Sequence, residues 1–250
     1  MSQMNEMVQR QLGHRTIREF KDIRIPGKVF DTLMEVARRT ATSNGMQSYS
    51  IIRVTDPFIK KEIAGVCNQE YVGRAPELLI FVVDQFKNNR IAKEKGAETE
   101  NAADMDWFFQ GFTDACLAVQ NVVNAAEAMD LGVVFFGSIL NDSERICKVL
   151  KLPKLTFPVL GLGIGYPDQD PQLKPRFENR IRVFENSYRI FENYLEEIKD
   201  YDQEMTTYYD LRNKNRKVDS FSDQVVAKLS TSIPNRQGIL KVIRQQGFKV

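Results

Sequence analysis

The segment PELLIFVVD, residues 76–84, holds six apolar side chains in a row between Glu77 and Asp84. A strand with one face in solvent alternates apolar and polar residues, whereas a strand covered on both faces is apolar throughout. The segment therefore predicts a strand that lies inside the molecule, with other elements packed against both of its faces.

Further strands and helices are predicted on either side of this run. The strands are expected at residues 49–54, 131–137 and 157–165, and helices at 26–39, 57–66, 101–129 and 142–151. The long helical pattern carries apolar residues on more than one stripe, so it is expected to be buried on several sides or in a subunit interface. Beyond residue 166 the chain is proline-broken and charged, and short helical patterns follow at about 191–211, 221–232 and 236–246.

The composition excludes several classes of protein. Lys and Arg number 35 and Asp and Glu 33, a net charge of +2, whereas nucleic-acid-binding domains usually carry a dense basic stripe. The three cysteines have no CxxC spacing, which argues against a disulfide framework or a zinc site. Because the chain shows no signal-peptide pattern and no apolar run of about 20 residues, a reduced, cytoplasmic protein without a membrane partner is expected.

The only histidine, His14, limits the chemistry that side chains can perform. One imidazole cannot build a multi-histidine metal site, and no G-x-S-x-G motif accompanies it for nucleophilic catalysis. Any difficult chemistry is therefore expected to be done by a cofactor.

Two basic clusters indicate a site for an anion. The segment HRTIREF begins at His14, with Arg15 next to it and Arg18 three residues further on. In KPR, the proline favours an extended chain, so Lys174 and Arg176 project to the same side as a fork. Each cluster alone could be a solvated basic segment. Together they could hold one phosphate group, at about 1.5–3 kcal/mol for each charge-assisted bond.

Three further motifs contain residue types that nucleotide-binding sites use. GLGIGYP, which begins at Gly161, has the spacing G-x-G-x-G and opens no helix, so a Rossmann site is excluded. A strand is predicted instead, whose glycines let another backbone or a helix approach closely. Gly137 and Ser138 follow a strand, where backbone N–H groups could face a ligand. LRNKNRK, from Leu211, is either a solvated loop or a site for an anionic substrate such as the 2′-phosphate of NADPH.

Taken together and in order, these motifs resemble the NADPH-dependent flavin reductase and oxygen-insensitive nitroreductase group of the nitroreductase superfamily. The resemblance covers residue 10 onward and rests on HRTIREF, ATSNGMQSYSIIRVTD, NQEYVGRAPE, LGVVFFGSILN, GLGIGYPDQDPQLKPR, ENSY and NRKVDSFSD. It implies an α+β, FMN-binding fold with a mixed, mostly antiparallel sheet flanked by helices, a long central helix, and a C-terminal extension that embraces the partner in a homodimer. Residues 1–166 would form the FMN-binding core, and residues 167–250 an extension that folds as one unit with it.

The resemblance also implies which residues form the site. The expected FMN contacts are His14, Arg15, Thr16, Arg18, Thr42, Ser43, Asn44, Gln69, Gly137, Ser138, Lys174 and Arg176. The expected NADPH contacts are Arg212 and Arg216. His14 and Arg15 would hold the phosphate, with Arg18 nearer the ring. No side chain is expected to act as a catalytic acid or base, and no metal is expected.

The chain departs from the family pattern at three positions. Ser138 stands where a second glycine is usual, Leu140 where an arginine is common, and Gly45 where relatives often carry an aromatic residue. These changes affect the open face above the flavin, where they bear on substrate range and on the choice between NADPH and NADH.

The activity implied is ping-pong hydride transfer from NADPH through FMN to nitroaromatic, quinone, free flavin or similar two-electron acceptors. One alternative is a regulatory module that binds FMN without turnover. Another is a specialised flavin reductase that acts on one metabolite.

Overall fold

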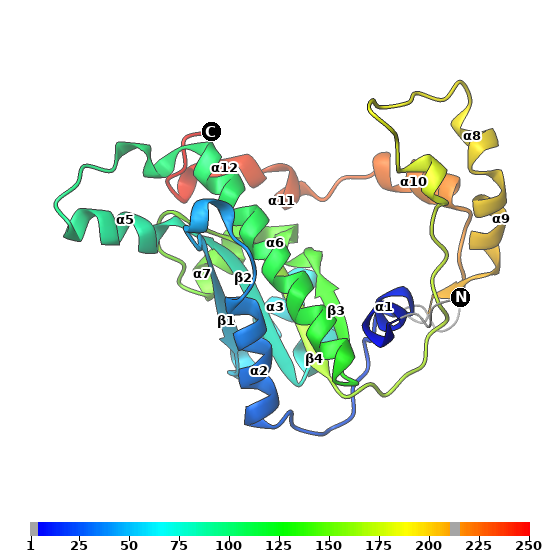
Figure 1. Ribbon diagram of the computed structural model, residues 1–250, viewed down its shortest axis with the longest axis horizontal. Helices are drawn as coiled ribbons and strands as arrows, with labels where there is room; N and C mark the ends of the chain where they lie inside the picture. Colours follow the sequence, from blue (N-terminus) through cyan, green and yellow to red (C-terminus); the bar gives the residue numbers. More distant parts are fainter. Residues whose placement is uncertain (1–4, 211–215) are drawn as a thin grey trace. The chain divides into compact units, whose positions relative to one another are not determined.

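The computed structural model describes residues 5–210 and 216–250, and the chain divides into two compact units (Figure 1). The first unit comprises the chain up to Gln169 together with Ile233–Val250, and the second comprises Asp170–Ser232. The expectation that residues 167–250 form one folding unit with the core stays a prediction.

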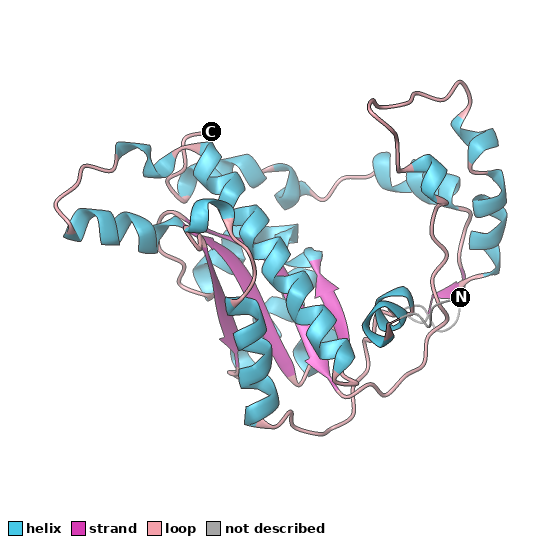
Figure 2. Cartoon of the chain, in the orientation of Figure 1, coloured by secondary structure: helices cyan, strands magenta, loops and turns pink. Residues whose placement is uncertain are grey.

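A four-stranded antiparallel sheet forms the middle of the first unit (Figure 2). Its strands are β1 (Tyr49–Val54), β2 (Glu77–Asp84), β3 (Gly132–Phe136) and β4 (Thr156–Gly165), in the order β1-β2-β4-β3. In the register, Ile51 lies opposite Phe81, and Gly161 lies between Ile80 and Phe136. All four predicted strands are confirmed, with ends within one residue of the expected ones.

Strand β2 is covered on both faces, as its apolar run predicted. The side chains at positions 79, 81 and 83 enter one core with α2 (Gly27–Arg38) and α6 (Met105–Ala128). Those at 78, 80 and 82 enter a second core with α3 (Pro57–Cys67) and α4 (Tyr71–Arg74). None of these six side chains is more than 2% exposed. The sheet therefore separates two apolar layers, and β2 belongs to both.

The remaining elements of the first unit are helices and short turns of 3-10 helix around the sheet. They are α1 (Glu6–Leu12), α2 (Gly27–Arg38), η1 (Ser43–Gly45), α3 (Pro57–Cys67), α4 (Tyr71–Arg74), α5 (Gln85–Glu94), η2 (Glu100–Ala103), α6 (Met105–Ala128), η3 (Gly137–Asp142), α7 (Ser143–Val149), α11 (Pro234–Gln237) and α12 (Ile239–Gln245). The long helix α6 crosses one face of the sheet, with buried residues spread over a broad stripe. Phe109 and Leu117 of the same helix remain 62% and 48% exposed, so α6 also presents apolar surface outside this core.

Several helix boundaries differ from the predictions. The helix expected at 142–151 is present as α7, which Asp142 caps by accepting the Arg145 N–H at 3.0 Å and which ends two residues early, at Val149. Helices α1 and α5 were not predicted. The sequence of α5, QFKNNRIAKE, has too few apolar residues for a helical pattern, but Asp84 caps its first turn through the Lys87 N–H at 3.0 Å.

The second unit has little apolar core of its own. It contains η4 (Asn179–Ile181), α8 (Tyr194–Glu197), α9 (Lys199–Thr207), β5 (Tyr209–Asp210), β6 (Arg216–Lys217) and α10 (Phe221–Leu229). The helix expected at 191–211 is thus divided into α8 and α9. The rings of Phe177, Tyr201 and Phe221 pack with centroids 4.4–5.5 Å apart. Many other apolar side chains stay exposed, among them Val183, Tyr188, Ile190, Leu195, Val226 and Leu229.

The glycines of β4 are closely approached, as predicted, but by aromatic rings. A Cβ at Gly161 or Gly163 would lie 3.0 Å from the side chain of Phe136. A Cβ at Gly165 would lie 2.7 Å from the ring of Phe20. The GLGIGYP motif is therefore a packing feature of the sheet, and the exclusion of a Rossmann site agrees with its position in β4.

Two helix glycines should respond to alanine in opposite directions. In Gly111→Ala on α6, the new methyl group would lie 2.6 Å from the backbone oxygen of Ser48 and 2.9 Å from Val83, so we expect a loss of about 1–3 kcal/mol in the free energy of unfolding. In Gly65→Ala on α3, nothing lies within 4 Å, so we expect a gain of about 0.5–1 kcal/mol. Urea unfolding followed by circular dichroism measures both. Equal effects of the two substitutions would contradict the close approach of α6 to the sheet.

Candidate functional site

The HRTIREF segment lies along the outer edge of β3. The Ile17 N–H donates to the Val133 oxygen at 2.9 Å, and Thr16 forms a parallel bridge with Val133. Gly132 makes this approach possible, because a Cβ there would lie 2.8 Å from the Ile17 side chain. Pairing with β3 therefore fixes the backbone of the first predicted FMN-binding segment.

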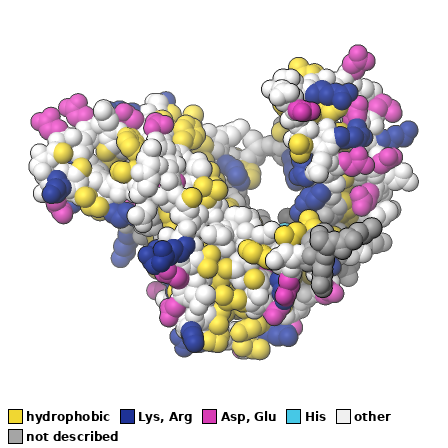
Figure 3. Space-filling view, in the orientation of Figure 1, with side chains coloured by type: hydrophobic (Ala, Val, Ile, Leu, Met, Phe, Trp, Pro, Cys, Tyr) yellow, Lys and Arg dark blue, Asp and Glu magenta, His cyan; other side chains and the backbone are white. Residues whose placement is uncertain are grey.

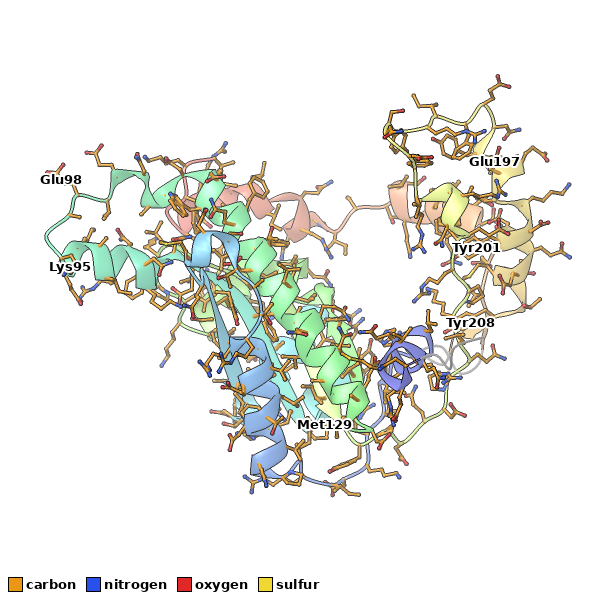
Figure 4. The ribbon with its side chains drawn as sticks, in the orientation of Figure 1. Lys95, Glu98, Met129, Glu197, Tyr201 and Tyr208 are labelled. Carbon is orange, nitrogen blue, oxygen red and sulfur yellow. The ribbon has the colours of Figure 1, made fainter. Side chains whose placement is uncertain are left out.

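Helix α1 and His14 are attached to the C-terminal end of α6, which precedes Met129 in Figure 4. The Nδ1 atom of His14 lies 2.6 Å from Oε1 of Glu127. Arg10 donates to the backbone oxygen of Glu127 at 2.9 Å and to Oδ1 of Asp130 at 2.6 Å. The hydrogen bond to Asp130 raises the pKa of Arg10. Cationic groups at this position also complement the partial negative charge of the helix end.

Arg15 and Arg18 follow in an ordered segment. Among the residues that the structure describes, no hydrogen bond or ion pair reaches the exposed Arg15 side chain. The N–H groups of Arg18 and Glu19 donate to Oε1 of Gln169 at 3.1 and 2.8 Å. Gln169 thus holds the backbone at Arg18, a predicted site residue, and this role was indicated by no pattern in the sequence.

The predicted flavin loop, Thr42 to Asn44, is held by a buried carboxylate. Asp114 of α6 is fully buried and accepts the N–H groups of Ser43 at 2.7 Å and Ser48 at 3.1 Å. Asn44 adopts a left-handed conformation with φ 51° and donates to Gln110 at 3.0 Å. The sequence analysis missed Asp114, although a single acid within the apolar pattern FTDACLAV was a usable signal.

Gly45, one of the three departures from the family pattern, has a backbone reason to be glycine. Its φ is 67°, in the left-handed region that side chains with a Cβ rarely adopt. The adjacent loop conformation therefore favours glycine over an aromatic residue at this position.

Gln69 and Ser138, predicted from separate motifs, are in contact. The Ser138 hydroxyl donates to Oε1 of Gln69 at 2.9 Å. Asn68 ends α3 with φ 51°, which turns the chain so that Gln69 follows at the end of β3. Burial raises the pKa of the neighbouring Cys67 thiol, and its hydrogen bond with Ser138 lowers it in part. No atom lies closer than 4.0 Å to the place of a Cβ on Gly137, so the strand end is uncrowded.

The first unit holds its predicted site residues in separate places. Thr42 to Asn44 lie near Asp114, whereas His14 lies at Glu127, thirteen residues further along α6. At 1.5 Å per residue this separation is about 20 Å along the helix. Figure 1 shows the loop and α1 near opposite ends of α6. The two segments are therefore not brought together within one chain.

The remaining predicted residues belong to the second unit. Lys174 and Arg176 are exposed in a segment without helix or strand, and Arg176 donates to the Pro175 oxygen at 3.2 Å. Arg212 lies outside the described residues. Arg216 begins β6, and its side chain also lies outside the description. The meeting of the two basic clusters at one phosphate stays a prediction.

A cavity of about 450 Å³ between α7 and α12 is lined by charged groups such as Lys148 and Glu144, which pair with each other at 2.6 Å, and by none of the predicted site residues. Within residues 5–210 and 216–250, no three His, Cys, Asp or Glu side chains are grouped to hold a metal. No helix in this part of the chain has the length and apolar character needed to cross a bilayer.

Comparison with known proteins gives consistent matches along nearly the whole chain. A model of the nitroreductase family matches residues 12–166, and a model of the family's C-terminal domain matches residues 174–250. The chain is 33% identical over 227 residues to a Bacillus subtilis protein named FMN reductase (NADPH), covering 89% of this chain and 91% of that protein.

Solved structures agree with this similarity. B. megaterium NfrA2 superposes with a TM-score of 0.90 at 30% identity, covering 98% of this chain and 99% of that one. An NADPH:FMN oxidoreductase from Vibrio harveyi, solved with NAD+, has a TM-score of 0.84 at 30% identity, covering 98% and 99% of the two chains. The α+β fold expected from the sequence is confirmed.

Replacement of the buried acid should loosen the 43–48 loop. In Asp114→Asn the new amide group has one acceptor oxygen, so one of the two backbone N–H groups would face an NH₂ group. We expect a loss of about 1.5–3 kcal/mol in the free energy of unfolding, measured in urea. The control is Gln120→Ala on the exposed side of the same helix, where Gln120 donates only to Asn124 among the described contacts, with a change within about 0.5 kcal/mol. A loss no larger than the control's would show that Asp114 does not hold the loop.

Proposed function

Because the chain belongs to the nitroreductase family, we propose that it transfers a hydride from NADPH through FMN, in ping-pong order, to a two-electron acceptor. It is an NAD(P)H-dependent FMN oxidoreductase. The observation that carries the finer proposal is the pair His14 and Arg15 at the end of α6, where the exposed Arg15 has no partner among the described residues.

His14 and Arg15 would hold the phosphate of FMN, together with Lys174 and Arg176. Phosphate offers only acceptor oxygens and a negative charge, which suits guanidinium, ammonium and imidazolium donors. Within residues 5–210 and 216–250 the Arg15 side chain has no ion pair that would have to be broken for this task. The backbone of Thr16 and Arg18, held by β3 and by Gln169, would carry the next part of the cofactor.

The flavin ring would lie at the uncrowded end of β3. Gln69 and Ser138 present an amide and a hydroxyl there, and Gly137 leaves room for a planar ring. FMN, when bound, accepts a hydride and passes two electrons on. The protein's own residues need only bind, orient and exclude water, and no side chain is assigned as acid or base.

A homodimer would complete each site. Because about 20 Å of α6 separates Asp114 from Glu127, the loop at Thr42 to Asn44 would contact the flavin of a partner copy rather than the flavin held by its own His14. The exposed apolar side chains of α6, Phe109 and Leu117, offer an interface, and Figure 3 shows other apolar side chains reaching the surface. Uncovered apolar residues of the second unit, such as Leu229, fit the proposed embrace.

The proposal also covers the NADPH contacts, the electron acceptors and the location of the protein. Arg212 and Arg216 would bind the 2′-phosphate of NADPH. The acceptors would be nitroaromatics, quinones or free flavin. The free thiols of Cys67, Cys116 and Cys147 fit the reducing cytoplasm as its location.

The first test is the visible spectrum of the purified protein, read anaerobically before and after addition of NADPH and then of NADH. We expect a flavin spectrum that bleaches rapidly with NADPH, followed by reoxidation on addition of a quinone. A flavin that stays oxidised would favour a binding module without turnover. Absence of flavin, even after addition of FMN, would refute the proposal.

Charge reversal tests the phosphate site. In Arg15→Glu or Lys174→Glu, the new carboxylate would repel the phosphate, so we expect folded protein that retains little FMN after desalting. The measurement is the ratio of flavin to protein absorbance. Glu35→Gln on α2 is the control and should retain full flavin, because the Glu35 carboxylate pairs only with Arg38 and Arg39 among the described contacts. Full occupancy in both charge-reversal variants would exclude these residues from the phosphate site.

Loss of Arg216 tests the NADPH site. In Arg216→Ala we expect the KM for NADPH to rise about tenfold or more while the KM for NADH changes little, since only NADPH carries the extra phosphate. Steady-state kinetics with both nucleotides measure this difference. Equal changes for the two nucleotides would remove Arg216 from that role.

A further inference from the structure

Glu127 and His14 form a contact that connects α6 to the proposed phosphate site. The Nδ1 and Oε1 atoms are 2.6 Å apart, and the two side chains are 29% and 13% exposed. Glu127 belongs to no motif of the sequence analysis. We infer that Glu127 is a positioning residue, which fixes the His14 ring so that Nε2 and its proton face the phosphate of FMN. This inference rests on the proposed function.

The hydrogen-bonding capacity of the ring carries the argument. A carboxylate is an acceptor only, so the Nδ1 atom of His14 must donate its proton to Glu127. In a neutral ring the Nε2 atom would then be an acceptor, and it would meet a phosphate oxygen that is also an acceptor. Nε2 donates to a phosphate oxygen only when it carries a proton as well, and the carboxylate at Nδ1 holds the ring in the orientation for this contact.

The neighbouring acid Asp130 is paired with Arg10, so Glu127 is the acid that contacts His14. On α1, Arg10 pairs with Glu6 at 3.1 Å and with Asp130 at 2.6 Å. Arg10 also donates a hydrogen bond to the backbone oxygen of Glu127. Among the described residues, no contact joins Arg10 to the Glu127 carboxylate. Asp130 is thus satisfied by Arg10, Arg15 follows in the chain as a further cation, and Glu127 is the acid that faces the imidazole.

Asp130 provides a matched control. Both Glu127 and Asp130 connect α1 to the end of α6, but only Glu127 contacts His14. Asp130 has φ 58°, a conformation that asparagine also tolerates, so Asp130→Asn removes a charge and little else. If Glu127 acted only by holding α1 against α6, Asp130→Asn would weaken FMN binding as well. If Glu127 acts on the phosphate through His14, only Glu127→Gln would weaken it.

The first measurement compares FMN with riboflavin, which has the same ring but no phosphate. Apoprotein of the wild type, Glu127→Gln and Asp130→Asn is titrated with each flavin, and quenching of flavin fluorescence gives the dissociation constants. We expect Glu127→Gln to weaken FMN binding about 10- to 100-fold and to change riboflavin binding less than twofold, because a bond to a charged group is worth about 1.5–3 kcal/mol. Asp130→Asn should leave the ratio of the two constants unchanged.

The second measurement uses the fact that the chain has one histidine. In tag-free protein, the imidazole ¹⁵N signals belong to His14 without assignment. We expect both ring nitrogens to carry a proton in the wild-type FMN complex, and the Nδ1 signal to shift in the Glu127→Gln complex, where an amide replaces the carboxylate. His14→Gln should weaken FMN about as much as Glu127→Gln, and the double variant should add little to either loss.

The outcomes separate the two proposals. If the wild type fails to bind FMN, the proposed function is wrong. If FMN binds and Glu127→Gln binds it equally well, or loses FMN and riboflavin alike, the inference is wrong and the function stands. A neutral ring in the wild-type FMN complex would also overturn the inference.

Discussion

The first unit depends on the burial of β2 from both sides. Its six apolar side chains alternate between two cores, and a strand in this position requires a layer of helices on each face. Helix α6 supplies most of one layer, and α3 and α4 contribute to the other. The two layers then set the site, because Asp114 and Glu127 belong to α6, whereas Gln69 follows α3. The chemistry at the sheet edges is therefore positioned by the packing at its centre.

Much of this architecture could be predicted from the sequence, because apolar patterns record burial. The unbroken run of β2, the glycines of β4 and the broad apolar face of α6 each gave the correct element. The polar helices α1 and α5 left no such pattern, since polar contacts such as those of Arg10 and Asp84 hold them in place. In the second unit, few apolar residues are buried, and the boundary between α8 and α9 was correspondingly missed.

The candidate site was predicted less completely than the fold. Motifs predicted Gln69 and Ser138 as site residues, and the structure places the two in contact. Asp114, Glu127 and Gln169, which contact the candidate site segments, were missed because each acts on a segment 66 to 151 positions away in the chain. Hydrogen bonds over such separations depend on the tertiary fold, so the spacing of residues within a motif does not predict them. Asp114 is the exception, as an acid within an apolar helix pattern is itself a signal.

Helix α6 supports the 43–48 loop through Asp114 and the His14 segment through Glu127, and this constrains the number of residues between the two acids during evolution. An α-helix advances 1.5 Å and turns about 100° with each residue. A single-residue insertion or deletion between Asp114 and Glu127 would rotate one acid away from its partner while the other stayed in place. Homologous chains can therefore gain or lose residues in the loops around α6 far more readily than within this span of thirteen residues.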